Sequence, residues 1–186
     1  LVGMNIGIVC YPTFGGSGVV ATELAKTLAR KGHNIHMMSY AKPARLDTLQ
    51  TGITYHEVSI NSYPLFEYPP YDLALATQMV NLIEYQDLDL LHVHYALPHA
   101  TSAYLAKQIM AEKGIHVPVV TTLHGTDITL VGSDPSYKHV VEFSIDKSDG
   151  VTAVSEFLKQ ETYDRFNIKQ DIKVIPNFID LDRFKK

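Results

Sequence analysis

The amino-acid sequence predicts an α/β fold, in which helices cover both faces of a doubly wound, mainly parallel β-sheet. Short apolar, β-rich runs alternate with helical patterns along the chain, which is typical of this class. The first run, residues 5–11, is apolar throughout, as expected for a strand buried on both faces. The 186 residues, 46% of them hydrophobic, suffice for one domain with a substantial core.

The first predicted helix covers residues 19–31 and shows the signals clearly. Val20, Leu24 and Leu28 recur every four residues, and Gly32 supplies a stop. We further expect strands at 34–40, 53–60 (near an edge), 88–94, 117–122, 150–154 and 172–175, and helices at 71–86, from Pro98 to before Gly114, at 136–147, and from Ser155 to about 166. Asp72 and Ser155 are the predicted caps of their helices.

Residues 61–71, NSYPLFEYPPY, break this alternation. Their prolines and aromatic side chains predict an ordered loop packed against the surface, or else a wall or lid of a cleft.

Charge and cysteine content exclude several classes of function. Sixteen Lys and Arg stand against twenty Asp and Glu, so no basic excess indicates nucleic-acid binding. No Lys or Arg occurs between Arg45 and Lys107, which disfavours a polyanion or an anionic membrane surface as partner. No apolar run is long enough to span a membrane. The single cysteine, Cys10, predicts a reducing compartment and thus a cytoplasmic location.

A glycine loop, Gly15 to Gly18 with Ser17 within it, connects the first strand to the first helix. Its glycines permit a tight turn, and the following helix start offers unpaired N–H groups to an anion. The spacing matches neither the dinucleotide-binding pattern nor the phosphate-loop pattern, so NAD and ATP are disfavoured. The alternative is a turn with a helix cap and no ligand.

Three further segments follow predicted strands. His92 and His94 share one strand face, a spacing that could suit a metal, yet no cysteine or carboxylate partner is nearby. Hydrogen bonds of these histidines at the sheet end are therefore favoured. Tyr95 is expected to reach into the cleft. His124 is placed to donate to a ligand, while Asp127 could orient it or only cap the next helix. The last segment, residues 174–180, is a strand, a proline break and a polar tail.

In this order the four segments resemble the N-terminal half of a retaining GT-B glycosyltransferase of family four. The resemblance covers residues 4–184 and implies a Rossmann-like, acceptor-side domain at 4–174. Residues 175–186 would begin a hinge to a C-terminal donor domain that this chain lacks, and residues 1–3, before Met4, look like an expression remnant. Such a chain alone is expected to be inactive.

The resemblance also implies substrates and roles. N-acetylglucosamine would pass from UDP-N-acetylglucosamine to L-malate, in bacillithiol biosynthesis, with retention at the anomeric carbon and no metal or other cofactor. A malate carboxylate would be received by Gly15, Gly16 and Ser17, with Tyr95 and Thr122 nearby. His124 would be the catalytic contact to the donor sugar, and Thr126, Asp127 and Asn177 would lie on the donor side or orient it. A basic residue from the other domain is expected to complete charge neutralisation.

Two alternatives remain at this point. One is a family-four enzyme with another sugar, inositol or lipid acceptor, of which the acidic middle third disfavours the lipid. The other is a stand-alone Rossmann-like module that binds an anion, for which the hinge-like ending would serve no purpose. The partners expected in each case are small molecules, and homo-oligomerisation is left open.

Overall fold

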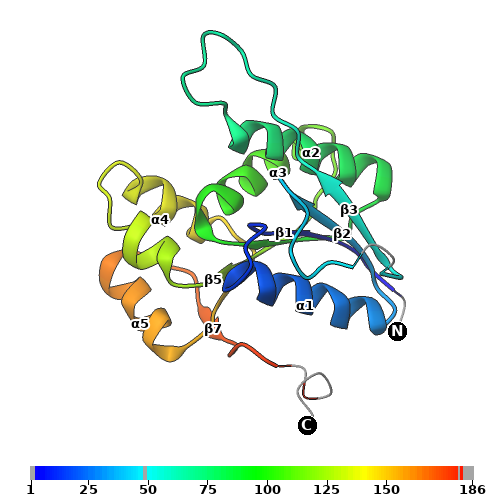
Figure 1. Ribbon diagram of the computed structural model, residues 1–186. Coiled ribbons are helices and arrows are strands. Elements are labelled where there is room, and N and C mark those ends of the chain that lie inside the picture. Colours follow the sequence, from blue (N-terminus) through cyan, green and yellow to red (C-terminus); the bar gives the residue numbers. More distant parts are fainter. Residues whose placement is uncertain (1–2, 48–49, 180, 182–186) are drawn as a thin grey trace.

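The computed structural model describes residues 3–47, 50–179 and 181, and these form one seven-stranded parallel sheet (Figure 1). The strand order is β3-β2-β1-β4-β5-β6-β7, which confirms the predicted Rossmann-like fold. The strands are β1 (Asn5–Val9), β2 (Asn34–Ser39), β3 (Ile53–Glu57), β4 (Leu90–His94), β5 (Val119–Leu123), β6 (Gly150–Ala153) and β7 (Ile172–Val174).

In the described part of the chain, five α-helices and two short helical segments connect the strands. They are α1 (Ser17–Arg30), α2 (Tyr71–Gln86), η1 (Ala96–Ala100), α3 (Thr101–Glu112), η2 (Asp127–Val131), α4 (Lys138–Asp146) and α5 (Glu156–Arg165). Leu97 interrupts η1 with an extended backbone. Among the described residues, none of these helices has the length and apolar character needed to cross a membrane.

The two faces of the sheet are covered unequally. Val9, Val93 and Val119 face α2 and α3 in one core cluster, and Val151 and Ala153 join α4 and α5 in a second cluster on the same face. The opposite face packs Ile6, Ile8 and Ile35 against α1. Figure 1 shows α1 on one side of the sheet and α2 and α3 on the other. Helices therefore lie on both faces, as predicted, but α1 covers its face alone near β1 and β2.

Local signals placed most helices within a few residues, but one of the two predicted helix caps is wrong. Ser155 caps α5 as predicted, because its Oγ accepts a hydrogen bond from the Leu158 N–H at 3.1 Å. Asp72 does not cap α2: it lies in the first turn after Pro70, where its charge still complements the helix dipole. The segment η2 was not predicted.

The prediction that residues 61–71 pack against the surface is wrong for most of the loop. Tyr63, Leu65, Phe66 and Tyr68 are at least half exposed. The segment extends away from the domain between β3 and α2 (Figure 1). Only Tyr71, at the start of α2, packs against the core.

The strand order defines where a ligand can bind. Neighbouring strands β1 and β4 lead into connections that diverge, β1 through α1 toward β2 and β4 through η1 and α3 toward β5. In open parallel sheets, the crevice beyond the carboxyl ends of two such strands is the usual ligand site. The glycine loop follows β1, and Tyr95 follows β4, so both predicted motifs lie at this point. Residues 1–2 of the supposed expression remnant, and 180 and 182–186 of the supposed hinge, are outside the described residues.

Candidate functional site

Aromatic rings bring the loops after β1, β4 and β5 together. Tyr11 contacts Tyr95 edge to face, with ring centroids 5.2 Å apart, and Tyr95 stacks on His124 at 5.7 Å. The Tyr95 hydroxyl also shares a 2.6 Å hydrogen bond with the Thr126 hydroxyl. Burial raises the pKa of Tyr11 to about 12, so its hydroxyl stays protonated at neutral pH. Three of the predicted site residues, Tyr95, His124 and Thr126, are thus in one contact network.

The glycine loop has the backbone geometry that its sequence predicts. Gly16 has φ 58° and ψ −134°, a conformation that disfavours any residue with a Cβ. Ser17 begins α1 directly afterwards and is 7% exposed. Among the described residues, neither the Ser17 N–H nor the Val19 N–H has a hydrogen-bond partner. With no acidic residue in the first turn, these N–H groups form a free positive helix end.

Thr13 holds this loop in place, and sequence reasoning missed it. Its Oγ1 donates to the Gly15 carbonyl at 2.6 Å and accepts the Gly18 N–H at 3.2 Å. A Cβ on Gly18 would lie 2.4 Å from the Tyr11 carbonyl oxygen, so only glycine fits there. A threonine three residues before a glycine-rich helix start was the available signal, since its hydroxyl can cap the helix.

Four histidines, His92, His94, His99 and His124, form a histidine cluster at the ends of β4 and β5. Nδ1 of His94 lies 2.8 Å from Nε2 of His124, and the His94 ring stacks between those of His92 and His124. Nδ1 of His99 donates to the His94 carbonyl. The predicted hydrogen bonding at the sheet end is therefore present. Within the described residues, no group of three or more His, Cys, Asp or Glu could hold a metal ion.

Burial keeps the histidine cluster uncharged at neutral pH. It lowers the pKa of His92, His99 and His124 to about 4 each, and that of His94 well below its usual value. Neighbouring histidines lower the pKa of His94 and His124 further, because each disfavours a second positive charge.

Asp127 ties the loops after β4 and β5 together. Its carboxylate is fully buried and accepts the backbone N–H groups of Ala96 at 3.1 Å, His124 at 3.2 Å and Gly125 at 2.9 Å. Burial raises its pKa, and these hydrogen bonds oppose the rise. Asp127 thus holds the backbone of His124. Among the described residues, it makes no hydrogen bond to the His124 imidazole ring.

Tyr95 adopts an unusual backbone conformation, with φ 95° and ψ 134°. Strain of this kind costs about 1–3 kcal/mol and persists only where the surroundings impose it. Here the Tyr95 N–H donates to the Thr122 carbonyl at 3.0 Å, and the Tyr95 carbonyl accepts the Ala100 N–H at 3.2 Å. In this conformation the Tyr95 ring contacts those of Tyr11 and His124.

The Thr122 side chain and Asn177 line a cavity to which His94 also contributes but Tyr95 does not. This apolar cavity of about 330 Å³ lies on the α1 side of the sheet, and Ile6, Leu24 and His92 also line it. The Thr122 hydroxyl is already engaged, at 2.7 Å from Nε2 of His92 and 2.8 Å from the Thr152 hydroxyl. Its predicted role in acceptor binding stays a prediction.

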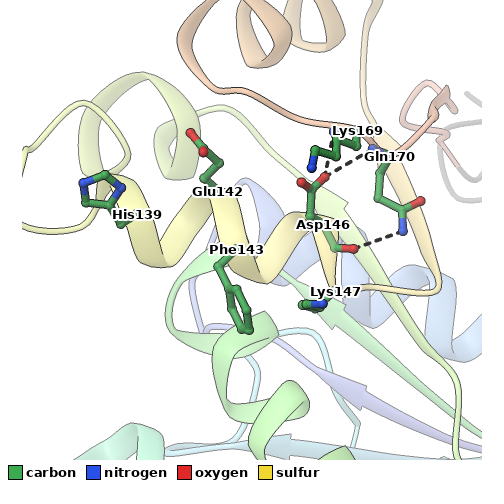
Figure 2. Close-up of a pocket in the computed structure, with 7 residues that line it drawn as sticks. All are labelled: His139, Glu142, Phe143, Asp146, Lys147, Lys169 and Gln170. Carbon is green, nitrogen blue, oxygen red and sulfur yellow. Dashed lines mark hydrogen bonds between the residues drawn. The ribbon is translucent and has the colours of Figure 1, made fainter.

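A larger cavity, of about 570 Å³, is open to solvent between α4 and the segment before β7 (Figure 2). Asp146 accepts the backbone N–H groups of Lys169 and Gln170 there, and the Gln170 side chain donates back to the Asp146 carbonyl (Figure 2). These residues precede β6 and β7 and so lie at the amino ends of the strands. Because ligands bind parallel sheets at the carboxyl ends, this cavity is not the candidate site.

Comparison with known families assigns this chain. The family model described as Glycosyltransferase Family 4 matches residues 14–183, so the chain belongs to that family. One relative, the N-acetyl-alpha-D-glucosaminyl L-malate synthase of Bacillus anthracis, is 52% identical over 95% of this chain. An uncharacterised glycosyltransferase of Methanocaldococcus jannaschii is 26% identical over 90% of it. The chain spans about half the length of these relatives, 46% and 44% respectively.

Solved structures show the same fold. A glycosyltransferase from Rickettsia africae ESF-5 matches with a TM-score of 0.70 and 26% identity, over 98% of this chain and 45% of that one. Anabaena Alr3699/HepE, solved in complex with UDP and glucose, also gives a TM-score of 0.70, at 16% identity, over 98% of this chain and 47% of its own. The fold expected from the resemblance, one half of a GT-B glycosyltransferase, is confirmed.

The role of Asp127 can be tested by replacing it with alanine. Asp127→Ala leaves three buried N–H groups without their charged acceptor, and each lost bond to a charged group costs about 1.5–3 kcal/mol. We expect the free energy of unfolding, measured with urea, to fall by at least about 3 kcal/mol. The control Asp171→Ala removes an exposed carboxylate 3.9 Å from Lys159 and should cost less than about 1 kcal/mol. Equal losses in both variants would contradict the proposed tie.

Stability should depend on pH through the histidine cluster. The folded pKa of His92, His99 and His124 is about 4, below the unfolded value of 6.5, so the unfolded state binds more protons between these values. The contribution of these histidines to the free energy of unfolding is fully present above pH 6.5. It falls toward pH 4, by up to about 1.4 kcal/mol per pH unit for each histidine. Lowered pKa values of His36 and His56 act in the same direction, and the raised pKa of Asp127 acts against it.

Urea unfolding at several values between pH 7.5 and pH 5 measures this slope. His124→Gln removes one titrating group and should flatten the curve. A stability that is constant across this range would show that the histidines titrate normally in the folded protein.

Proposed function

We propose that the protein to which this chain belongs transfers N-acetylglucosamine from UDP-N-acetylglucosamine to L-malate, and that this chain holds the acceptor. The choice of these substrates rests on one observation, the 52% identity to the malate synthase over 95% of the chain. Family membership supports glycosyl transfer over a stand-alone anion-binding module. A small-molecule reaction in the cytoplasm, without metal or other cofactor, is part of the same proposal.

The glycine loop is the proposed malate carboxylate site. A carboxylate there would accept hydrogen bonds from the N–H groups of Ser17 and Val19 and from the Ser17 hydroxyl. None of these three groups has a hydrogen-bond partner among the described residues. No Lys or Arg occurs between residues 46 and 106, so the loops after β3 and β4 supply no cation. Among the loops after β1, β3 and β4, the helix-end N–H groups of α1 are therefore the main anion donors.

His124 is the proposed contact to the donor sugar. In the proposed reaction the bond from the anomeric carbon to UDP breaks as the bond to the malate hydroxyl oxygen forms on the same face. The hydroxyl proton passes to the departing phosphate. A neutral imidazole fixed next to Tyr95 can donate a hydrogen bond to the reacting sugar without reorganising.

The carboxylate site is tested by comparing Gly16→Val with Ser17→Ala in the full-length protein. The valine adds about 1–3 kcal/mol of strain at φ 58° and moves the N–H groups, so malate affinity should fall strongly. Ser17→Ala spares the N–H groups and should cost only about 0.5–1.5 kcal/mol. Calorimetric titration measures both, and circular dichroism checks folding.

The matched control is Gly32→Val, at the other end of α1. Gly32 also has positive φ, at 92°, and open space around a Cβ, so its stability loss should be similar while malate binding is unchanged. If Gly16→Val binds malate as the parent does, the carboxylate is bound elsewhere and the loop is only a turn.

His124→Ala should lower kcat more than malate affinity, because a contact to the reacting sugar is strongest in the transition state. We expect a loss on the order of 100-fold in kcat. His116→Ala, at an exposed position before β5, serves as control. Unchanged turnover with weakened malate binding would instead place His124 in the acceptor site.

A further inference from the structure

His94 is buried directly behind His124 and touches it through one atom pair. It is 1% exposed, and its Nδ1 lies 2.8 Å from Nε2 of His124. Its other nitrogen, Nε2, is buried without a hydrogen-bond partner among the described residues. The pair therefore has a single hydrogen bond, whose direction decides which nitrogen of His124 carries the proton.

Two arrangements are possible, because both rings are neutral and each carries one proton. In the first, His94 donates from Nδ1, and His124 carries its own proton on Nδ1. In the second, His124 donates from Nε2, which leaves Nδ1 of His124 as a bare acceptor. The second arrangement also puts a proton on Nε2 of His94, where no acceptor is in reach.

The neighbouring His99 shows which of its two ring nitrogens carries the proton in this buried environment. A carbonyl oxygen only accepts, so Nδ1 of His99 must donate to the His94 carbonyl, and Nε2 of His99 is a bare nitrogen. That Nε2 is also buried and without a partner among the described residues. Buried N–H groups without an acceptor are the rarer defect in native proteins. The first arrangement repeats the His99 pattern and avoids such a group.

We propose that His94 is a positioning residue: its Nδ1–H donates to Nε2 of His124 and thereby fixes the His124 proton on Nδ1. The functional part of this inference rests on the proposed role of His124 in glycosyl transfer. Nδ1 of His124 has no hydrogen-bond partner among the described residues, so it is free to act on a ligand. His124 then offers a donor to negative charge that develops on the reacting sugar or its leaving group.

The same contact also fixes the plane of the ring. The His124 ring is stacked between His94, at 5.0 Å and 28°, and Tyr95, at 5.7 Å and 22°. The Asp127 hydrogen bond fixes the His124 backbone, and Tyr95, whose ring lies against that of His124, has a strained backbone. With the ring plane set by stacking, the hydrogen bond from His94 selects the tautomer.

The direct test is nuclear magnetic resonance of the full-length protein labelled with ¹⁵N at histidine. At pH 7.5 we expect the Nδ1–H tautomer for both His94 and His124, and a scalar coupling across the N–H···N bond between them. An Nε2–H tautomer for His124 in the parent protein overturns the proposal. This measurement needs no substrate and no turnover.

Two variants connect the tautomer to activity. His94→Leu keeps a similar bulk and removes the donor, so the Nδ1–H form of His124 should lose its dominance. By analogy with other partners that orient a functional histidine, kcat should fall about 10-fold to 100-fold with little change in the KM for malate. His94→Asn carries an amide N–H at the position of Nδ1 and should restore both the tautomer and most of kcat.

A merely structural His94 would give a different result. Both variants would then lower stability and kcat together, and the His124 tautomer would not change, which overturns the proposal. If the parent protein shows no malate-dependent transfer, the proposed function fails, whereas the tautomer measurement still decides the role of His94.

Discussion

The parallel pairing of β1 with β4 is the constraint on which the candidate site depends. Because the connections from these strands diverge, Tyr11 after β1 and Tyr95 after β4 meet beyond the carboxyl ends of the strands, on the same side of the sheet as the glycine loop. The pairing of β4 with β5 adds His124, one residue past β5. Strand pairing thus brings loops that are more than 100 residues apart in sequence to the same end of the sheet.

Side chains then fix what the backbone brings together. Asp127 neutralises its buried charge with N–H groups from both the β4 and β5 loops, so those loops cannot separate without exposing an unpaired carboxylate. The Tyr95 backbone, held by its hydrogen bonds to Thr122 and Ala100, keeps a strained conformation within this frame, and burial keeps the histidine cluster uncharged. The site is therefore preorganised at the expense of stability at low pH, a common feature of functional sites.

The sequence predicted the elements well because hydrophobic periodicity and glycine stops are local signals. Helix α2 was predicted at its observed bounds, and the open question of His92 and His94 was answered in favour of sheet-end hydrogen bonds. Contacts between side chains of neighbouring strands could not be predicted from the sequence. Examples are the contact of His94 with His124 and the hydrogen bonds of Thr122 with His92 and Thr152. The positive φ of Tyr95 was not predicted either. The prediction that the 61–71 loop packs against the surface was wrong for the same reason. Apolar composition does not show whether another part of the chain lies close enough to cover the side chains.

The electrostatics of this half lead to a requirement on its partner. Malate, the proposed acceptor, is a dianion, whereas the candidate site offers neutral hydroxyls, neutral histidines and helix-end N–H groups with only part of a positive charge. The charge of Asp127 is nearby and is balanced by hydrogen bonds rather than by a cation. One malate carboxylate can be matched at the glycine loop, but the second has no cationic counterpart in the loops after β3 and β4. If the full-length protein has the length of the matched relatives, about twice that of this chain, we propose that the compensating Lys or Arg lies in the part outside this chain. Closure of the two halves over the acceptor would then complete its charge balance as well as bring the donor sugar to His124.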